Sequence, residues 1–306
     1  MKNPVASSIA PSSSGAAGVK RPRILGVAHI ALYTSDLEKA RVFYKDFLGF
    51  EEPFCLKGKD GNERIAFIKV NDNQYIELFA EAPRGGAGQL NHISFYTDDA
   101  HGMRDYLASR GVKVPGKVGK GRTGNTNFNV TDPDGHVVET VQYEPDSWTS
   151  REKGRFMPDA RISFHVPHLG VLVGALEPAM RFYKDVLGFQ ETWRGGSPEA
   201  LSWVNMRVPD GEDYVEFMLC REPPAPQRMG VKNHLCLAVA AVAKAIADLE
   251  ARPARKSYGR PIEMQVGKNR RRQANLFDPD GTRIELMEPG TIDGKPVPSS
   301  TAPAPR

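Results

Sequence analysis

The chain has 306 residues, of which 40% are hydrophobic and 25% are charged, a composition that suits a globular protein with one large core or two ordinary ones. The formal net charge of +4 at pH 7 is too small to indicate a nucleic-acid partner. The sequence contains no run of 18 apolar residues, so we expect no membrane partner. Three cysteines without a CxxC pair argue against a disulfide framework and against a thiolate metal site.

Both ends of the chain have the composition of disordered tails. Residues 1–23 are rich in Ser, Ala, Gly and Pro, and residues 290–306 are rich in Pro and Ser. The first stretch lacks the apolar segment of a signal peptide, so we expect a cytoplasmic protein.

The first structural unit is predicted from hydrophobic periodicity. Residues 26–32 have the length and composition of a strand, and residues 36–47 carry apolar side chains at helical spacing, with Gly49 ending the helix. Alternating apolar residues over 64–70 and 75–79 predict two strands joined by a turn of Asn and Asp residues. The order is a strand, a helix and then a set of strands.

The same order follows in a second unit. Residues 91–96 predict a strand and residues 100–110 a helix, and strands are predicted over 127–130 and 137–141. An Asp-Pro-Asp-Gly turn beginning at Asp132 joins the last two strands. Two βαβββ units therefore follow one another.

The pair of units is itself repeated. The octapeptide Phe-Tyr-Lys-Asp-Phe-Leu-Gly-Phe at residues 43–50 recurs with one change at residues 182–189, and the Asp-Pro-Asp-Gly of residues 132–135 recurs at residues 278–281. We therefore predict an α+β protein of four βαβββ modules. Its parts are a domain over residues 24–146, a linker over 147–159, a second domain over 160–289, and the two tails.

Histidines and glutamates occupy matched positions in this repeat. Each module opens with a His on its first strand and carries a Glu on its last strand; the eight residues are His29, Glu77, His92, Glu139, His168, Glu216, His234 and Glu285. A Glu that faces an apolar core needs a partner that offsets its desolvation. Two neutral imidazoles and two carboxylates balance a divalent cation such as Zn, Ni, Co, Mn or Fe. The other histidines, His101, His136 and His165, are interpreted as structural.

These motifs resemble the vicinal oxygen chelate superfamily, which contains glyoxalase I, extradiol dioxygenases and fosfomycin resistance proteins. The resemblance implies paired βαβββ modules that curl into half-barrel domains, each around one metal ion. It implies one ligand set of His29, Glu77, His92 and Glu139 and a second of His168, Glu216, His234 and Glu285. Whether each set forms within one domain or across the two, and whether one or both bind metal, stays open.

A complete His, Glu, His, Glu set resembles the glyoxalase I type. The resemblance implies a lyase or isomerase that acts on a small substrate with adjacent oxygens through a metal-stabilised enediolate, with Glu139 and Glu285 as the catalytic bases. An Fe(II) ring-cleaving dioxygenase of extradiol type is the first alternative. A non-catalytic small-molecule-binding or resistance protein is the second.

The sequence departs from glyoxalase I where that family holds glutathione. Tyr33 and Glu81 in the first domain, and Leu172 and Cys220 in the second, replace the expected Arg and Asn. We therefore expect a different small-molecule substrate. A basic run over residues 268–272, with Lys120 and Arg122 in the first domain, could bind an anionic one. We expect a monomer or a homodimer.

Overall fold

In a computed structural model that describes residues 19–82 and 88–305, the chain forms two eight-stranded sheets. The first contains β1 (Ile24–Tyr33), β2 (Glu51–Lys57), β3 (Glu63–Asn71), β4 (Gln74–Phe79), β5 (Leu90–Thr97), β6 (Gly119–Lys120), β7 (Thr126–Thr131) and β8 (Val137–Gln142). The second contains β9 (His168–Val173), β10 (Gln190–Gly196), β11 (Leu201–Arg207), β12 (Tyr214–Leu219), β13 (His234–Ala238), β14 (Met264–Val266), β15 (Arg271–Phe277) and β16 (Arg283–Thr291).

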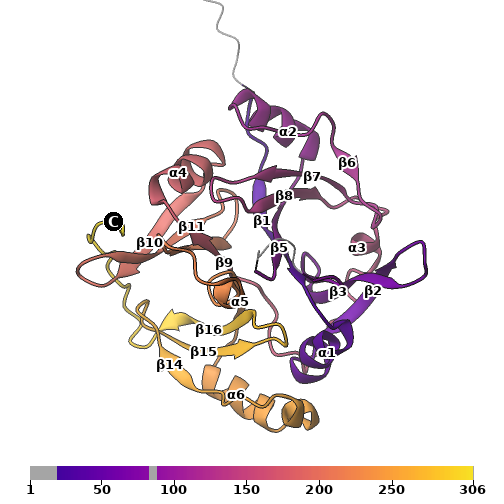
Figure 1. Cartoon of the computed structure of the whole chain (residues 1–306), viewed down its shortest axis with the longest axis vertical. Helices are drawn as coiled ribbons and strands as arrows, with labels where there is room; N and C mark the ends of the chain where they lie inside the picture. Colours follow the sequence, from indigo (N-terminus) through magenta and orange to yellow (C-terminus); the bar gives the residue numbers. More distant parts are fainter. Residues whose placement is uncertain (1–18, 83–87, 306) are drawn as a thin grey trace, which may run out of the picture.

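The sheets are curled and lie side by side, with β1 and β9 near the middle of the molecule (Figure 1). Few helices accompany them: α1 (Leu37–Arg41), η1 (Val42–Phe47), α2 (Ala100–Ser109), α3 (Trp148–Arg151), α4 (Leu176–Met180), η2 (Arg181–Val186), α5 (Pro226–Met229), α6 (Val242–Glu250) and η3 (Pro253–Ser257). This is the predicted α+β architecture of two half-barrel domains. Within the described ranges, no helix combines the length and the apolar character that crossing a bilayer requires.

Strand order places both modules of a domain in one sheet. The first sheet runs β2-β3-β4-β1-β5-β8-β7-β6, and the second repeats this order as β10-β11-β12-β9-β13-β16-β15-β14. The opening strands of the two modules are antiparallel neighbours, so His92 lies opposite Ala31 and His234 lies opposite Gly170. Each His and Glu set therefore assembles within its own domain, which answers the question of pairing that the sequence left open.

The repeated octapeptide does not form the regular helix that its periodicity predicts. After one turn of α-helix, η1 and η2 continue as π-helices, in which the amide of Leu48 donates to the carbonyl of Phe43 five residues earlier. Such wide turns occur mostly as local insertions in α-helices. Gly49 then ends the element at a φ of 81°, which favours glycine.

The two motifs of the repeat meet across the domain junction. The hydroxyl of Tyr44 in η1 donates to the Asp278 carboxylate in the turn of the second domain, at 3.0 Å, and Tyr183 in η2 donates to Asp132 of the first domain, at 2.9 Å. The apolar core is continuous between these contacts, with Phe95 against Phe189 at 5.2 Å between ring centroids. The duplicated motifs therefore stabilise the junction between the two domains.

The linker and the C-terminal stretch pack on the domains. The linker contains α3, whose Trp148 lies against Phe54 of β2 with ring centroids 5.4 Å apart. We expected residues 290–306 to be a free tail, but β16 continues to Thr291, and the amide of Leu201 donates to the carbonyl of Pro303. Backbone pairing with the second sheet accounts for this difference.

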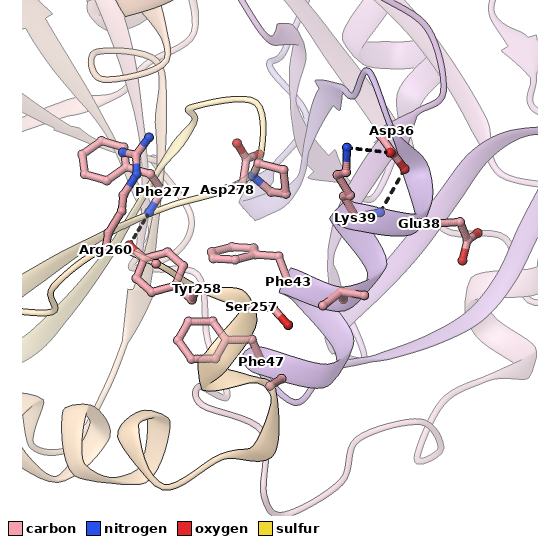
Figure 2. Close-up of a pocket in the computed structure, with 14 residues that line it drawn as sticks. Asp36, Glu38, Lys39, Phe43, Phe47, Ser257, Tyr258, Arg260, Phe277 and Asp278 are labelled. Carbon is pink, nitrogen blue, oxygen red and sulfur yellow. Dashed lines mark hydrogen bonds and ion pairs between the residues drawn. The ribbon is translucent and has the colours of Figure 1, made fainter.

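Asp278 gives the domain junction a pH dependence. It lies beside Phe43 and Tyr258 where the two domains meet (Figure 2), and burial raises its pKa to about 6 from an ordinary value of 3.8. The matched Asp132 has His136 as a second partner, 2.9 Å away, whereas Thr282 stands at that place in the second domain. Ionisation of Asp278 therefore opposes folding.

We expect Asp278→Asn to change the pH dependence of stability. Because the folded state binds the Asp278 proton more tightly than the unfolded state, wild-type stability contains a contribution that is present below about pH 4 and is lost by about pH 6, amounting to up to about 3 kcal/mol. The free energy of unfolding of the variant, relative to wild type, should rise across this window in denaturant titrations. A difference that stays flat with pH contradicts the assignment.

Candidate metal centres

The first cluster brings together the four residues expected in the first domain. His29 Nε2 on β1 lies 2.9 Å from His92 Nε2 on β5, 3.6 Å from Glu77 Oε1 on β4 and 2.7 Å from Glu139 Oε2 on β8. His92 Nε2 is 4.0 Å from Glu77 Oε2 and 3.6 Å from Glu139 Oε2. Metal bonds of about 2.0–2.2 Å place neighbouring ligand atoms roughly 3–4 Å apart, so this spacing fits a metal ion.

Two asparagines orient ligands of the first cluster. The Asn91 side-chain oxygen lies 2.8 Å from His92 Nδ1, which assigns the proton to Nδ1 and leaves the Nε2 lone pair facing the cluster. Asn127 on β7 donates to Glu139 Oε1 at 2.6 Å. Among the described residues, Glu139 Oε2 is buried without a hydrogen bond of good geometry, as expected of an oxygen that binds a cation.

The electrostatics of the first cluster favour added positive charge. Burial opposes the protonation of His29, but the carboxylates of Glu77 and Glu139 outweigh it and raise the pKa of the imidazole. Burial raises the pKa of Glu77. Burial acts in the same direction on Glu139, but the charge of His29 outweighs it and holds the pKa of that carboxyl well below its usual range. Glu139 is therefore the carboxylate that stays ionised.

A small hollow of about 40 Å³ opens onto the first cluster. It is lined by residues of the sheet and of the segments next to it, together with Thr149 of α3; the lining includes Phe67, Tyr75, Asn125, Asn127 and Tyr143. Sequence reasoning did not select these residues. Asn127 was the one within reach of sequence reasoning. It lies on β7, which pairs with β8, the strand that carries Glu139, and it stands opposite Val141 there.

The second cluster brings together the other four expected residues. His168 Nε2 on β9 is 3.2 Å from His234 Nε2 on β13 and 3.2 Å from Glu285 Oε2 on β16. His234 Nε2 lies 3.6 Å from Glu216 Oε2 on β12 and 3.6 Å from Glu285 Oε2. The donor set thus repeats that of the first domain.

An arginine distinguishes the second cluster from the first. Arg283 Nη2 lies 2.8 Å from His234 Nδ1 and 2.9 Å from His234 Nε2. Burial and then the Arg283 charge lower the pKa of His234 to about 3. The buried thiol of Cys236 also lies within reach of His168 and Glu285, at the position that Ser94 holds in the first domain. The sequence comparison missed both differences, because it considered only His and Glu.

The remaining predicted residues lie apart from the clusters or at their margins. His136 contacts Asp132 in its turn, and His165 Nε2 lies 2.8 Å from Asp213, whereas His101 is exposed on α2. Of the basic residues proposed to hold an anion, Lys268 lines a hollow of about 60 Å³ at the second cluster. In the first domain, Arg122 donates to the carbonyl of Lys57, and Lys120 is exposed on β6.

A cavity of about 600 Å³ lies apart from both clusters. Figure 2 shows it between η1 of the first domain and the segment after η3 of the second, with Phe43, Phe47, Tyr258 and Phe277 on its walls. Phe47 and Tyr258 stack with centroids 4.9 Å apart, and Arg260 covers Phe277. The wall is therefore formed by side chains that pack the domain junction.

Comparisons with known proteins agree with this architecture. The sequence model of the glyoxalase/bleomycin resistance protein/dioxygenase superfamily matches residues 26–140 and again residues 165–286. The chain is 25% identical over 297 residues to glyoxalase I from Saccharomyces cerevisiae, covering 85% of this chain and 85% of that protein.

Two solved structures share the fold over nearly the whole chain. The 2,3-dioxygenase LapB from Pseudomonas sp. KL28 has a TM-score of 0.67 at 17% identity, covering 92% of this chain and 99% of that one. A Mn(II)-bound glyoxalase from Novosphingobium aromaticivorans has a TM-score of 0.64 at 18% identity, covering 93% and 89%. At these identities the likeness shows the fold alone.

Proposed function

Because the chain belongs to the glyoxalase/bleomycin resistance protein/dioxygenase superfamily, we propose that it is a lyase or isomerase of glyoxalase type that depends on a divalent metal ion. His29, Glu77, His92 and Glu139 of the first domain hold the ion. The observation that carries this proposal is the convergence of four ligand side chains, of which all but Glu77 are buried, with Glu139 Oε2 2.7 Å from His29 Nε2. We identify the superfamily with the vicinal oxygen chelate superfamily that the sequence motifs resemble.

The residues of the first cluster have separate tasks. A bound divalent ion would act as a Lewis acid for two oxygens on adjacent substrate carbons and so would acidify the C–H bond next to the carbonyl. Glu139 takes the proton of that carbon, because its Oε2 is buried at the cluster without a hydrogen-bond partner among the described residues and is free to accept that proton. Asn127 holds the other oxygen of Glu139 in place, and Asn91 fixes the tautomer of His92.

The substrate is a small molecule with a hydroxyl or carbonyl oxygen on each of two adjacent carbons. The hollow of about 40 Å³ has room for an ion and a few solvent molecules, so its lining must move for a substrate to enter. Tyr33, which stands where glyoxalase I carries an Arg for glutathione, lies against Phe79 at 6.2 Å between ring centroids. We therefore expect turnover without a glutathione adduct.

An assay in deuterated solvent tests the proposed chemistry. The protein is loaded with Mn, Zn, Ni, Co or Fe(II) and given α-hydroxy aldehydes, the hemithioacetal of methylglyoxal with glutathione, or catechol, with and without oxygen. We expect deuterium at the substrate carbon next to the carbonyl, under anaerobic conditions, for at least one hydroxy-carbonyl compound. Oxygen consumption and ring opening of catechol by the Fe(II) form would instead identify a dioxygenase. Stoichiometric metal with ligand binding but no turnover would identify a binding protein.

A further inference from the structure

Arg283 faces the second cluster because of its place on β16. It precedes Glu285 by two residues, and alternate residues of a strand point to the same face of a sheet. The matched residue of the first domain, two before Glu139 on β8, is Val137. The two clusters therefore have the same ligands but different neighbours, one cationic and one apolar.

The guanidinium of Arg283 lies against the imidazole of His234, which would have to bind the metal ion. His234 Nδ1 lies 2.9 Å from the carbonyl oxygen of Lys232, which only accepts, so Nδ1 carries the proton and Nε2 carries the lone pair. Arg283 Nη2 lies 2.8 Å from Nδ1 and 2.9 Å from Nε2, so the guanidinium sits beside the ring between its two nitrogens. A permanent cation therefore stands within 3 Å of the atom that a metal ion would have to bind.

The backbone of the second domain permits this arrangement of His234. Its ring lies against Gly170, where a Cβ atom would come within 1.9 Å of the ring atoms Cε1 and Nδ1. The matched residue of the first domain is Ala31, which lies opposite His92 in the sheet. A methyl group at that position excludes from the first cluster the ring orientation that His234 adopts in the second.

The charge of Arg283 also opposes metal binding at the second cluster. A guanidinium stays charged in proteins, so the second cluster already contains a permanent cation beside the carboxylates of Glu216 and Glu285. A divalent ion placed among the same side chains would meet strong repulsion from that neighbour. In the first cluster the matched Val137 leaves the carboxylates without such a partner.

From these observations we infer that Arg283 replaces the metal ion in the second domain, so that the chain binds one divalent ion, in the first domain. The ligand residues of the second cluster suit a metal ion, but the positive charge of Arg283 beside them opposes its binding. The inference deepens the proposed function and rests on it in part, because it assigns the working centre to one of the two repeats. Glu285 then has a structural task as a partner of the buried cationic site.

Exchanging the matched residues between the domains tests this inference. Wild-type protein, Arg283→Val, Arg283→Lys and Val137→Arg are loaded with Mn(II), freed of excess ion, and measured for metal per chain by elemental mass spectrometry. We expect one ion in wild type, two in Arg283→Val, one in Arg283→Lys, and none in Val137→Arg. Adding His168→Ala to Arg283→Val should remove the gained ion, and circular dichroism shows whether each variant is folded.

The outcomes separate this inference from the proposed function. Two ions in wild type, one of them lost in His168→Ala or in Cys236→Ser, would overturn the inference while leaving the first centre intact. A folded Arg283→Val protein that gains no ion also overturns it. If the first-domain assignment is wrong, wild type holds no ion and Val137→Arg has nothing to lose, but the gain of one ion in Arg283→Val still supports the role of Arg283.

Discussion

His29→Ala is expected to remove the bound metal ion and to reduce turnover to the uncatalysed level. His29 Nε2 is the most central atom of the first cluster, since it lies within 3.6 Å of ligand atoms of the other three residues. Loss of an outer partner of a metal ligand typically costs 10–100-fold in affinity, so loss of the ligand itself should cost at least about 100-fold. Titration with Mn(II), followed by electron paramagnetic resonance, measures this change directly.

Two other histidine variants serve as comparisons. His101 is exposed on α2, so His101→Ala should retain both the ion and the activity. His168→Ala removes the matched histidine of the second domain, and it should retain the ion of the first domain. A His29→Ala protein that keeps wild-type metal affinity would contradict the first centre, and so would loss of the only bound ion in His168→Ala.

Glu139→Gln is expected to lower the rate of proton transfer by about 10²–10⁴-fold at saturating metal. The amide retains an oxygen for the ion but cannot take the proton, because it has no basic oxygen. The exchange of the substrate C–H with solvent deuterium, measured by nuclear magnetic resonance, reports this step separately from product release.

Glu77→Gln is the matched control for the base. Glu77 lies across the cluster from Glu139 and also contributes a ligand oxygen, so its replacement should weaken metal binding. Once the ion is restored by excess metal, the exchange rate of Glu77→Gln should exceed that of Glu139→Gln by at least about tenfold. Equal rates in the two variants at saturating metal would contradict the assignment of Glu139 as base.

The sequence was sufficient to predict the architecture because the repeat supplied an internal comparison. Matched positions identified His29 with His168 and Glu139 with Glu285 without any coordinates, and hydrophobic periodicity located the strands that carry them. The structure brings each set of four together within one sheet. The superfamily that the motifs resemble is confirmed by the family model over both repeats.

Other features depend on contacts that no local pattern encodes. The periodicity of residues 36–47 fits a regular helix, whereas the π-helix of η1 places the Tyr44 hydroxyl on Asp278 of the other domain. In α3, Trp148 packs on Phe54 and Thr149 lines the hollow at the first cluster. The composition of this stretch predicts only a polar linker. These are tertiary effects that outweigh local propensity.

Arg283 was accessible to sequence reasoning but was not found by it. Its spacing of two residues from Glu285 and the alternation of a strand are enough to place it on the face of the second cluster. Matched His and Glu positions alone do not distinguish the two domains. Examining the neighbours of matched ligands, and not only the ligands, would have distinguished the two domains.

The measurement that tests the central claim most directly is an anomalous difference map from crystals of the wild-type protein loaded with Mn(II). We expect one strong peak, among His29, Glu77, His92 and Glu139, and none among the matched residues of the second domain. A peak at the second cluster without one at the first would contradict the account of both centres.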